Sequence, residues 1–195
     1  MRASNSEHFQ RFDFVPSYGV EIDPEFPADG SWGHAVYAFN RDGEIVETLS
    51  SNWGTPRVLL VTPSKAEPWV GLFPHGGLGG VSGVFAMPGS SSLCVSVGGL
   101  VFVLKVDHPE AGAVVESAAQ QIVASGSHDL LLVSSFTDLT AFNSEGVAWQ
   151  SARLVLDDLR VLSADGDTIR CSGTGLESLS HELIEIDAKT GSPNR

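Results

Sequence analysis

The chain has 195 residues, of which 42% are hydrophobic and 18% are charged. A chain of this length buries a core without disulfide or metal staples, and its composition is too apolar for a disordered protein. Eleven Lys and Arg residues stand against 24 Asp and Glu residues, and the formal net charge of -13 disfavours nucleic acid and anionic membranes as partners.

The N-terminal region shows no targeting signal. Residues 1–13 lack the apolar core of a signal peptide, and no aliphatic run in the chain approaches the roughly 20 residues of a membrane span. Cys94 and Cys171 lie in apolar stretches without a CxxC pattern, which predicts buried free thiols in a reducing compartment. We therefore expect a cytoplasmic protein that does not enter a membrane.

A hairpin pattern begins at residues 38–43, which read Ala-Phe-Asn-Arg-Asp-Gly, and it recurs at residues 141–146 as Ala-Phe-Asn-Ser-Glu-Gly. In both, glycine follows phenylalanine by four positions and supplies the positive φ of a tight turn. An apolar residue and a hydroxyl residue then follow at matching offsets. Related patterns occur at residues 73–82, 112–117 and 183–191, so the sequence predicts five similar hairpins.

An apolar strand precedes each hairpin. Three of these strands end in Ser96, Ser134 and Ser172, at intervals of 38 residues, and residues 58–62 form a fourth example. Alternation along the next strand places Leu104 with Val106 on one face. The faces predicted in this way require cover from neighbouring sheets.

The repeated pattern is an apolar strand, then Asn or Asp, then Gly, then a strand with an apolar and a hydroxyl residue. Over residues 32–195 this pattern resembles the blades of the β-propeller superfamily, with PQQ-like and WD-type repeats. The resemblance implies an all-β fold, a small β-propeller of five blades in a single domain, residues 1–195. Its units are approximately residues 24–49, 50–83, 84–117, 118–151 and 152–195. Residues 1–23 are the expected closing segment, supplying an N-terminal strand from residues 12–15 or 19–22 to the last unit. A closed ring predicts a monomer, and an open one predicts a homodimer.

A helix is the alternative for residues 111–125, where Ala118, Ala119, Gln120 and Gln121 favour helix formation. The β-branched residues on either side favour strands, and we expect strands here.

Known catalytic and cofactor motifs are missing. No serine has the glycine spacing of a nucleophile elbow, and the glycine-rich residues 76–80 lack the lysine of a P-loop. Asp165, Gly166 and Asp167 predict a turn rather than a calcium loop, and no two of the six histidines have close metal-ligand spacing. We expect neither a cofactor nor a metal.

Large aromatic and basic residues gather between residues 31 and 75. Because tryptophan and arginine often anchor recognition, we predict a binding site formed by Trp32, His34, Trp53, Arg57 and His75. The alternative for Trp53 and for Trp69 is packing between adjacent blades.

Three classes of function follow from these observations. The first is a non-enzymatic interaction module whose loops bind a protein, a peptide or a small-molecule ligand. The alternative is a hydrolase acting on a sugar or an ester, with carboxylate and histidine residues at the central channel. The third is a structural unit of a larger assembly.

Overall fold

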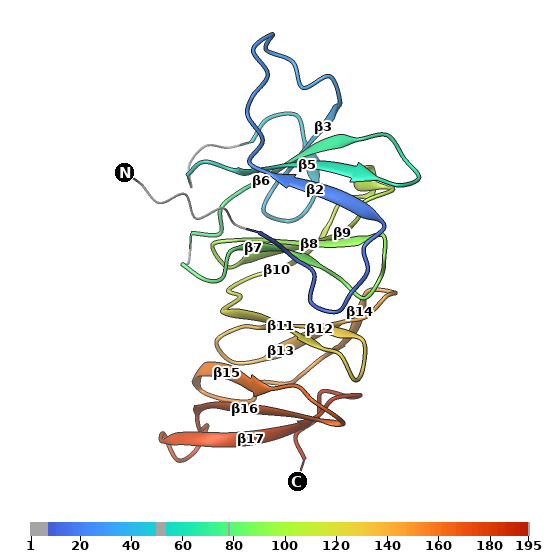
Figure 1. Ribbon diagram of the computed structural model, residues 1–195. Coiled ribbons are helices and arrows are strands. Elements are labelled where there is room, and N and C mark those ends of the chain that lie inside the picture. Colours follow the sequence, from blue (N-terminus) through green and yellow to red (C-terminus); the bar gives the residue numbers. More distant parts are fainter. Residues whose placement is uncertain (1–7, 50–53, 78, 195) are drawn as a thin grey trace, which may run out of the picture.

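The computed structural model describes residues 8–49, 54–77 and 79–194 (Figure 1). These residues form strands β1 to β17 and one short 3-10 helix, Pro109–Ala111. The all-β prediction is therefore confirmed. No helix in the described ranges is long and apolar enough to cross a membrane.

The strands form four sheets, which we call layers 1 to 4. Layer 1 has the strand order β2 (Tyr18–Ile22), β5 (Arg57–Pro63), β6 (Trp69–Phe73), β3 (Ala35–Phe39) and β4 (Ile45–Val46). Layer 2 has the order β1 (Phe9–Gln10), β7 (Gly83–Ala86), β8 (Ser92–Val97), β9 (Leu100–Lys105) and β10 (Val114–Glu116). Layer 3 contains β11 (Gln121–Ser125), β12 (Leu130–Ser134), β13 (Leu139–Phe142) and β14 (Val147–Gln150). Layer 4 contains β15 (Asp157–Ser163), β16 (Thr168–Thr174) and β17 (His181–Asp187).

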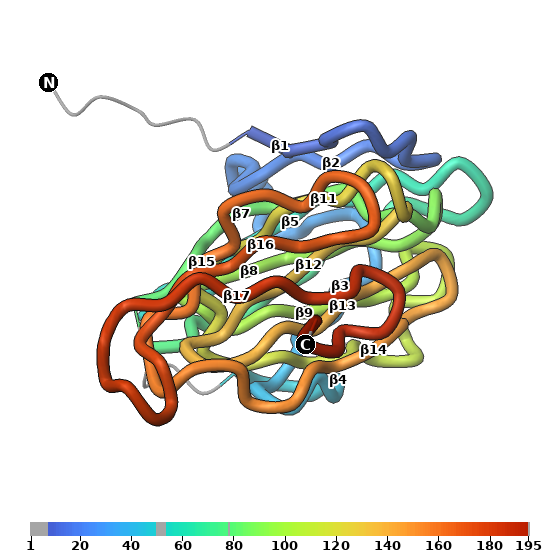
Figure 2. Tube along the Cα trace, turned by 90° about the horizontal axis from the view of Figure 1, so that it is seen from below, coloured from blue at the N-terminus to red at the C-terminus, as the bar shows by residue number. Residues whose placement is uncertain are grey.

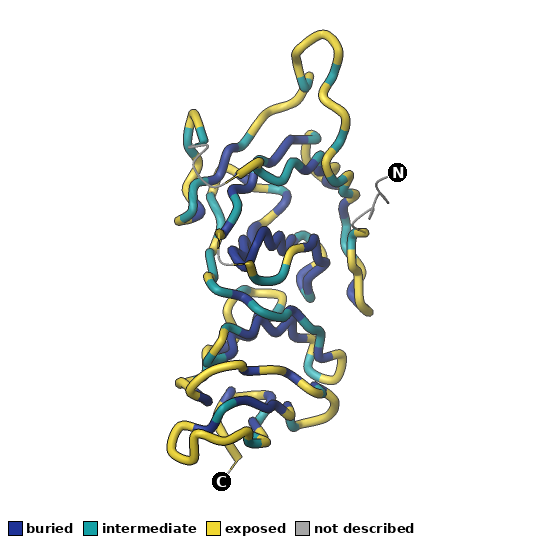
Figure 3. The backbone as a smooth tube through the Cα atoms, turned by 90° about the vertical axis from the view of Figure 1, so that its left-hand side faces the viewer, coloured by how far each residue is buried: buried dark blue, intermediate teal, exposed yellow. Residues whose placement is uncertain are grey.

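The four layers stack face to face along the chain, from layer 1 at one end to layer 4 at the other (Figures 1 and 3). Three apolar clusters separate them, one at each junction. The buried residues therefore lie between the sheets, and exposed residues gather in the connecting loops and at the two ends of the stack, as Figure 3 shows.

Strand β8 shows why the strands of the inner sheets are largely apolar. Its residues are all buried. Leu93 and Val95 belong to the cluster shared with layer 1, whereas Cys94 belongs to the cluster shared with layer 3. A strand covered on both faces carries apolar residues toward both junctions, which removes the usual alternation. The two buried serines of β8, Ser92 and Ser96, both take part in hydrogen bonds.

Both cysteines are free and buried, as the sequence predicts. Burial disfavours the thiolate, so it raises the pKa of Cys94 and raises the pKa of Cys171 to about 12. At neutral pH both thiols act as small apolar core groups.

The predicted ring of five blades is not what these sheets form, because there are four of them and none closes or curls. The closing segment also lies elsewhere than predicted. Strand β1 pairs with β7 in layer 2 and β2 pairs with β5 in layer 1, so neither joins β17 in layer 4. The N-terminal strands and the C-terminus lie at different parts of the stack (Figures 1 and 2).

Aromatic contacts explain why the N-terminal strands stay beside layers 1 and 2. The Tyr18 hydroxyl donates a buried hydrogen bond of 2.6 Å to the Ser92 carbonyl oxygen in layer 2. Burial raises the pKa of this phenol, which keeps it protonated as a donor. The ring of Phe9 lies 5.7 Å from the Tyr18 ring, centroid to centroid. These contacts hold the segment at the first junction.

Side-chain hydrogen bonds tie each layer to the next. The Trp69 Nε1–H donates to the Val106 carbonyl oxygen (2.8 Å), and the Trp149 Nε1–H donates to the Ala188 carbonyl oxygen (2.9 Å). Trp69 thus packs between adjacent sheets, which was the alternative to a binding role. Between layers 3 and 4, the Gln121 side chain donates to the Val161 carbonyl oxygen and accepts from the Val161 N–H.

The predicted hairpins at residues 38–43 and 141–146 are the connections β3 to β4 and β13 to β14. The two turns have similar hydrogen bonds. The Asn40 Oδ1 accepts the N–H groups of Asp42 and Glu44, and the Asn143 Oδ1 accepts those of Glu145 and Gly146. Strands β10 and β11 occupy residues 114–116 and 121–125, where the sequence favoured strands over a helix.

Gly43 provides a test of the first junction. Gly43 and Gly30 have φ angles of 82° and 79°, so alanine at either position costs about 1 kcal/mol of conformational strain. At Gly43 the added Cβ would also clash with the Ala113 carbonyl oxygen and with Val115 in layer 2, whereas Gly30 has open space. We expect Gly43→Ala to lower the melting temperature in circular dichroism clearly more than Gly30→Ala. Equal shifts would contradict the contact between layers 1 and 2.

Candidate functional site: a groove between layers 2 and 3

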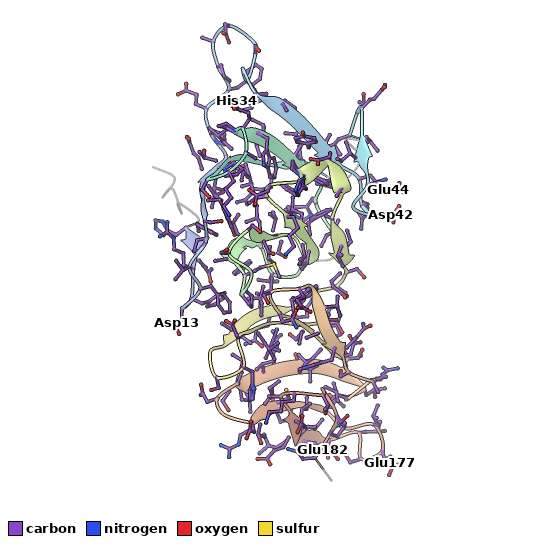
Figure 4. All side chains as sticks on the ribbon, turned by 90° about the vertical axis from the view of Figure 1, so that its right-hand side faces the viewer. Asp13, His34, Asp42, Glu44, Glu177 and Glu182 are labelled. Carbon is purple, nitrogen blue, oxygen red and sulfur yellow. The ribbon has the colours of Figure 1, made fainter. Side chains whose placement is uncertain are left out.

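The structure distributes the sequence-predicted site residues over layer 1. Trp32 is half-buried in the loop from β2 to β3, where its ring meets Phe26 edge to face at 5.1 Å. His34 is exposed just before β3 (Figure 4). Trp53 lies outside the described residues.

The other two predicted residues have local partners. Arg57 begins β5, and its Nε lies 3.4 Å from the Asp23 carboxylate. His75 follows β6, and its Nδ1 accepts the Gly77 N–H at 3.0 Å.

Strand register shows how these residues are arranged. Ala35 pairs with Trp69 at the start of β6, so His34 lies at that end of layer 1. Arg57 pairs with Phe73 at the other end of β6, and His75 follows Phe73. The structure therefore brings Arg57 and His75 to one end of the sheet and leaves His34 at the opposite end.

A groove of about 290 Å³ opens between layers 2 and 3. Its apolar lining comes mainly from β9, β10 and the residues between them, and its polar lining comes from both layers. It is lined by Met87, Ser92, Val103, Leu104, Lys105, His108, Ala111, Gly112, Ala113, Val114, Asn143, Glu145 and Gly146. The volume suits one small side chain or a small molecule rather than an extended polymer.

The two walls of the groove are turns whose sequences specify their shape. On layer 2, Pro109 begins the 3-10 helix, and Gly112, with φ 82°, returns the chain into β10. On layer 3, the Asn143 side chain caps the turn from β13 to β14. Pro at a helix start and Gly at a positive φ are the residues that these positions favour.

Lys105 crosses the groove at the end of β9. Its Nζ donates to the Ser92 Oγ at 2.7 Å and to the Ser144 carbonyl oxygen at 3.1 Å, which ties layer 2 to layer 3. An ammonium has three N–H donors, and these two bonds use two of them. Among the described residues, the third has no hydrogen-bond partner.

His108, which lines the groove, has an acidic neighbour. His108 Nδ1 lies 3.2 Å from the Glu110 Oε1, and both side chains are exposed. Hydrogen bonding from its own backbone N–H, followed by the contact with His108, lowers the pKa of Glu110. Glu145 lies on the opposite wall. The groove therefore combines an apolar lining with the Lys105 ammonium and with the polar side chains of His108 and Glu145.

Similar openings lie at the other two junctions. The opening between layers 1 and 2 is lined by residues that include Asp42, Glu44 and Glu110, and the one between layers 3 and 4 by residues that include Trp149 and Lys189. Figure 4 shows Asp42 and Glu44 projecting from the β3 to β4 turn. Among the residues that the structure describes, no group of three His, Cys, Asp or Glu side chains could hold a metal ion.

Comparison with known proteins adds no relative. No protein-family model, curated protein or solved structure matches this chain. The site is therefore defined by its geometry alone.

Sequence reasoning missed the central residues of this groove. Asn143 and Glu145 lie in a turn that the sequence had predicted, so a search of the turn residues would have found them. Lys105 gives no local signal, because it is only the polar end of an apolar strand. Its place in a groove depends on the contact between two sheets.

Lys105 should contribute measurably to stability. We expect Lys105→Met to lower the free energy of unfolding by about 1 kcal/mol, because it removes two charge-assisted hydrogen bonds, one within layer 2 to Ser92 and one across to Ser144 beside layer 3. Lys189→Met is the matched control, since its ammonium faces an exposed Asp167 carboxylate at 3.2 Å and such pairs contribute little. Urea unfolding of both variants measures the difference, and an equally small effect at Lys105 would contradict its role as a tie.

Proposed function

We propose that the protein is a non-enzymatic binding module that takes a ligand in the groove between layers 2 and 3. The observation that carries this proposal is Lys105, which lies among apolar residues with a third N–H donor for a ligand. Burial of an apolar group beside one directed polar contact is the usual chemistry of small-ligand sites. The ligand is a protein, a peptide or a small molecule that presents an apolar group next to a carboxylate.

The ionisable groups at the groove support binding more than hydrolysis. Lys105 is engaged with Ser92 and Ser144, and His108 is paired with Glu110 on the exposed rim. A hydrolase needs such groups to exchange protons with a bound substrate in the cleft. These local partners instead support a fixed, preorganised surface.

Two broader proposals accompany this one. We infer that the layers are related to propeller blades, which is supported by the similar turns at Asn40 and Asn143 and by the tryptophan bonds between layers. We also propose a reducing, cytoplasmic environment, which is supported by the buried free thiols. The site of Trp32, His34, Trp53, Arg57 and His75 stays a prediction.

The groove can be tested with N-acetyl-leucine, which carries one apolar side chain and one carboxylate. In a two-dimensional NMR titration we expect shifts of the Val114, Gly112 and Gly146 amides, with a dissociation constant on the order of 1 mM. The C-terminal amide of the same compound should bind more weakly, because it lacks the negative charge that Lys105 favours.

A matched pair of variants locates the binding site. Val114 and Val36 are 50% and 45% exposed, but Val114 lines the groove and Val36 lies in layer 1. We expect Val114→Asp to weaken binding at least about tenfold through lost apolar contact and charge repulsion, and Val36→Asp to leave it unchanged. Shifts outside the groove, or equal effects of the two variants, would refute the proposed site.

A further inference from the structure

The turn from β13 to β14 repeats the turn from β3 to β4, and the two turns border different openings. Each turn reads Asn, one variable residue, an acidic residue and Gly, at residues 40–43 and 143–146. Asp42 of the first turn lines the opening between layers 1 and 2, whereas Glu145 of the second lines the groove between layers 2 and 3. Differences between these two equivalent turns therefore indicate which groups the groove leaves available to a ligand.

The Asn143 amide nitrogen lacks the partner that the first turn provides. In that turn, the Asn40 Nδ2 donates to the Glu44 Oε2 at 3.0 Å. Val147 stands at the position that matches Glu44, four residues after the asparagine, and its side chain offers no acceptor. Among the described residues, no group accepts from the Asn143 Nδ2, while the Asn143 Oδ1 still caps the turn. Because Asn143 lines the groove, its amide is a second donor there in addition to the Lys105 ammonium.

The Glu145 carboxylate supplies the opposite charge in the groove. Glu145 is exposed, and no side chain within the described ranges forms a hydrogen bond or an ion pair with its carboxylate. The preceding residue, Ser144, accepts from the Lys105 Nζ at 3.1 Å, so the acid directly follows the residue that holds the ammonium. The opening between layers 1 and 2 has three acidic residues and no lysine in its lining, and that between layers 3 and 4 has a lysine and no acidic residue. Of these three openings, the groove alone is lined by both a lysine and an acidic residue.

We propose that the groove binds a free α-amino acid with an apolar side chain, such as leucine, in its zwitterionic form. This inference rests on the proposed function, because it names the ligand of the same groove. The α-carboxylate accepts from the third N–H of Lys105 and from the Asn143 Nδ2. The α-ammonium pairs with the Glu145 carboxylate, and the apolar side chain packs against Val103 and Val114 in the lining.

Charge and size both favour a free amino acid over a peptide. The N-terminal residue of a peptide lacks the carboxylate and the C-terminal residue lacks the ammonium, so neither satisfies both charged positions of the groove. A zwitterion has no net charge, so the formal charge of -13 on the chain does not repel it as it repels an anion. The groove volume of about 290 Å³ is close to the lower end of the range for small-molecule sites.

Two-dimensional NMR titrations with leucine and with N-acetyl-leucine test the ammonium contact. Wild-type protein should bind leucine about threefold more tightly than N-acetyl-leucine, because an exposed ion pair contributes modestly. In Glu145→Gln, the ratio of the two dissociation constants should fall to about one. Asp42→Asn is the matched control, because it removes one negative charge from the equivalent position of the other turn, and it should keep the wild-type ratio. Equal ratios in the wild-type protein and in Glu145→Gln would overturn the inference.

Asn143→Asp tests the carboxylate contact. Aspartate keeps the side-chain oxygen that caps the turn and replaces the amide donor by a negative charge, and thermal melting in circular dichroism verifies that the variant is folded. We expect it to weaken binding of leucine and of N-acetyl-leucine alike, by at least about fivefold, because both compounds carry the carboxylate. Asn40→Asp, at the matching position of the other turn, should leave both dissociation constants unchanged. Unchanged binding by the folded Asn143→Asp protein would refute this contact.

The two compounds also separate this inference from the proposed function on which it rests. If N-acetyl-leucine shifts the groove amides and leucine binds no more tightly, the zwitterion is rejected and the groove remains a site for a carboxylate beside an apolar group. If neither compound shifts these amides, both the inference and the proposed function are rejected.

Discussion

Burial of both faces of the inner sheets is the constraint on which this structure depends. The rings of Phe39 and Phe73 stack at 4.9 Å in layer 1, and Phe102 of layer 2 lies 5.3 Å from Phe73. Each such side chain contributes on the order of 2 kcal/mol when it leaves water. No single layer could bury these residues alone, so the sheets are stable only as a stack.

The turns and the cores have different tasks in this stack. Apolar side chains determine which faces meet, whereas directed bonds from Trp69, Trp149 and Gln121 fix how the faces are aligned. Openings lie beside the turns at all three junctions. A ligand site can therefore vary at the turns without a change in the packed layers.

Local patterns in the sequence predicted local structure well. Glycine spacing located the hairpins at Asn40 and Asn143, and β-branched residues favoured strands near Val114. The pairing of β1 and β2 could not be predicted, because it depends on contacts such as that of Tyr18 with Ser92, which are 74 residues apart. The groove has the same origin: Lys105 meets Ser144 only after two sheets have stacked. Neither contact produces a pattern that a short stretch of the amino-acid sequence could reveal.

The outer face of layer 4 carries charges that oppose the addition of a further sheet. Further face-to-face stacking on layer 4 would cover exposed ion pairs, in which Arg170 meets Glu185 at 3.1 Å and Arg160 meets Asp158 at 3.2 Å. Removing these charges from water costs more than an exposed pair returns. The ion pairs on the outer face of layer 4 therefore disfavour a further sheet on that face.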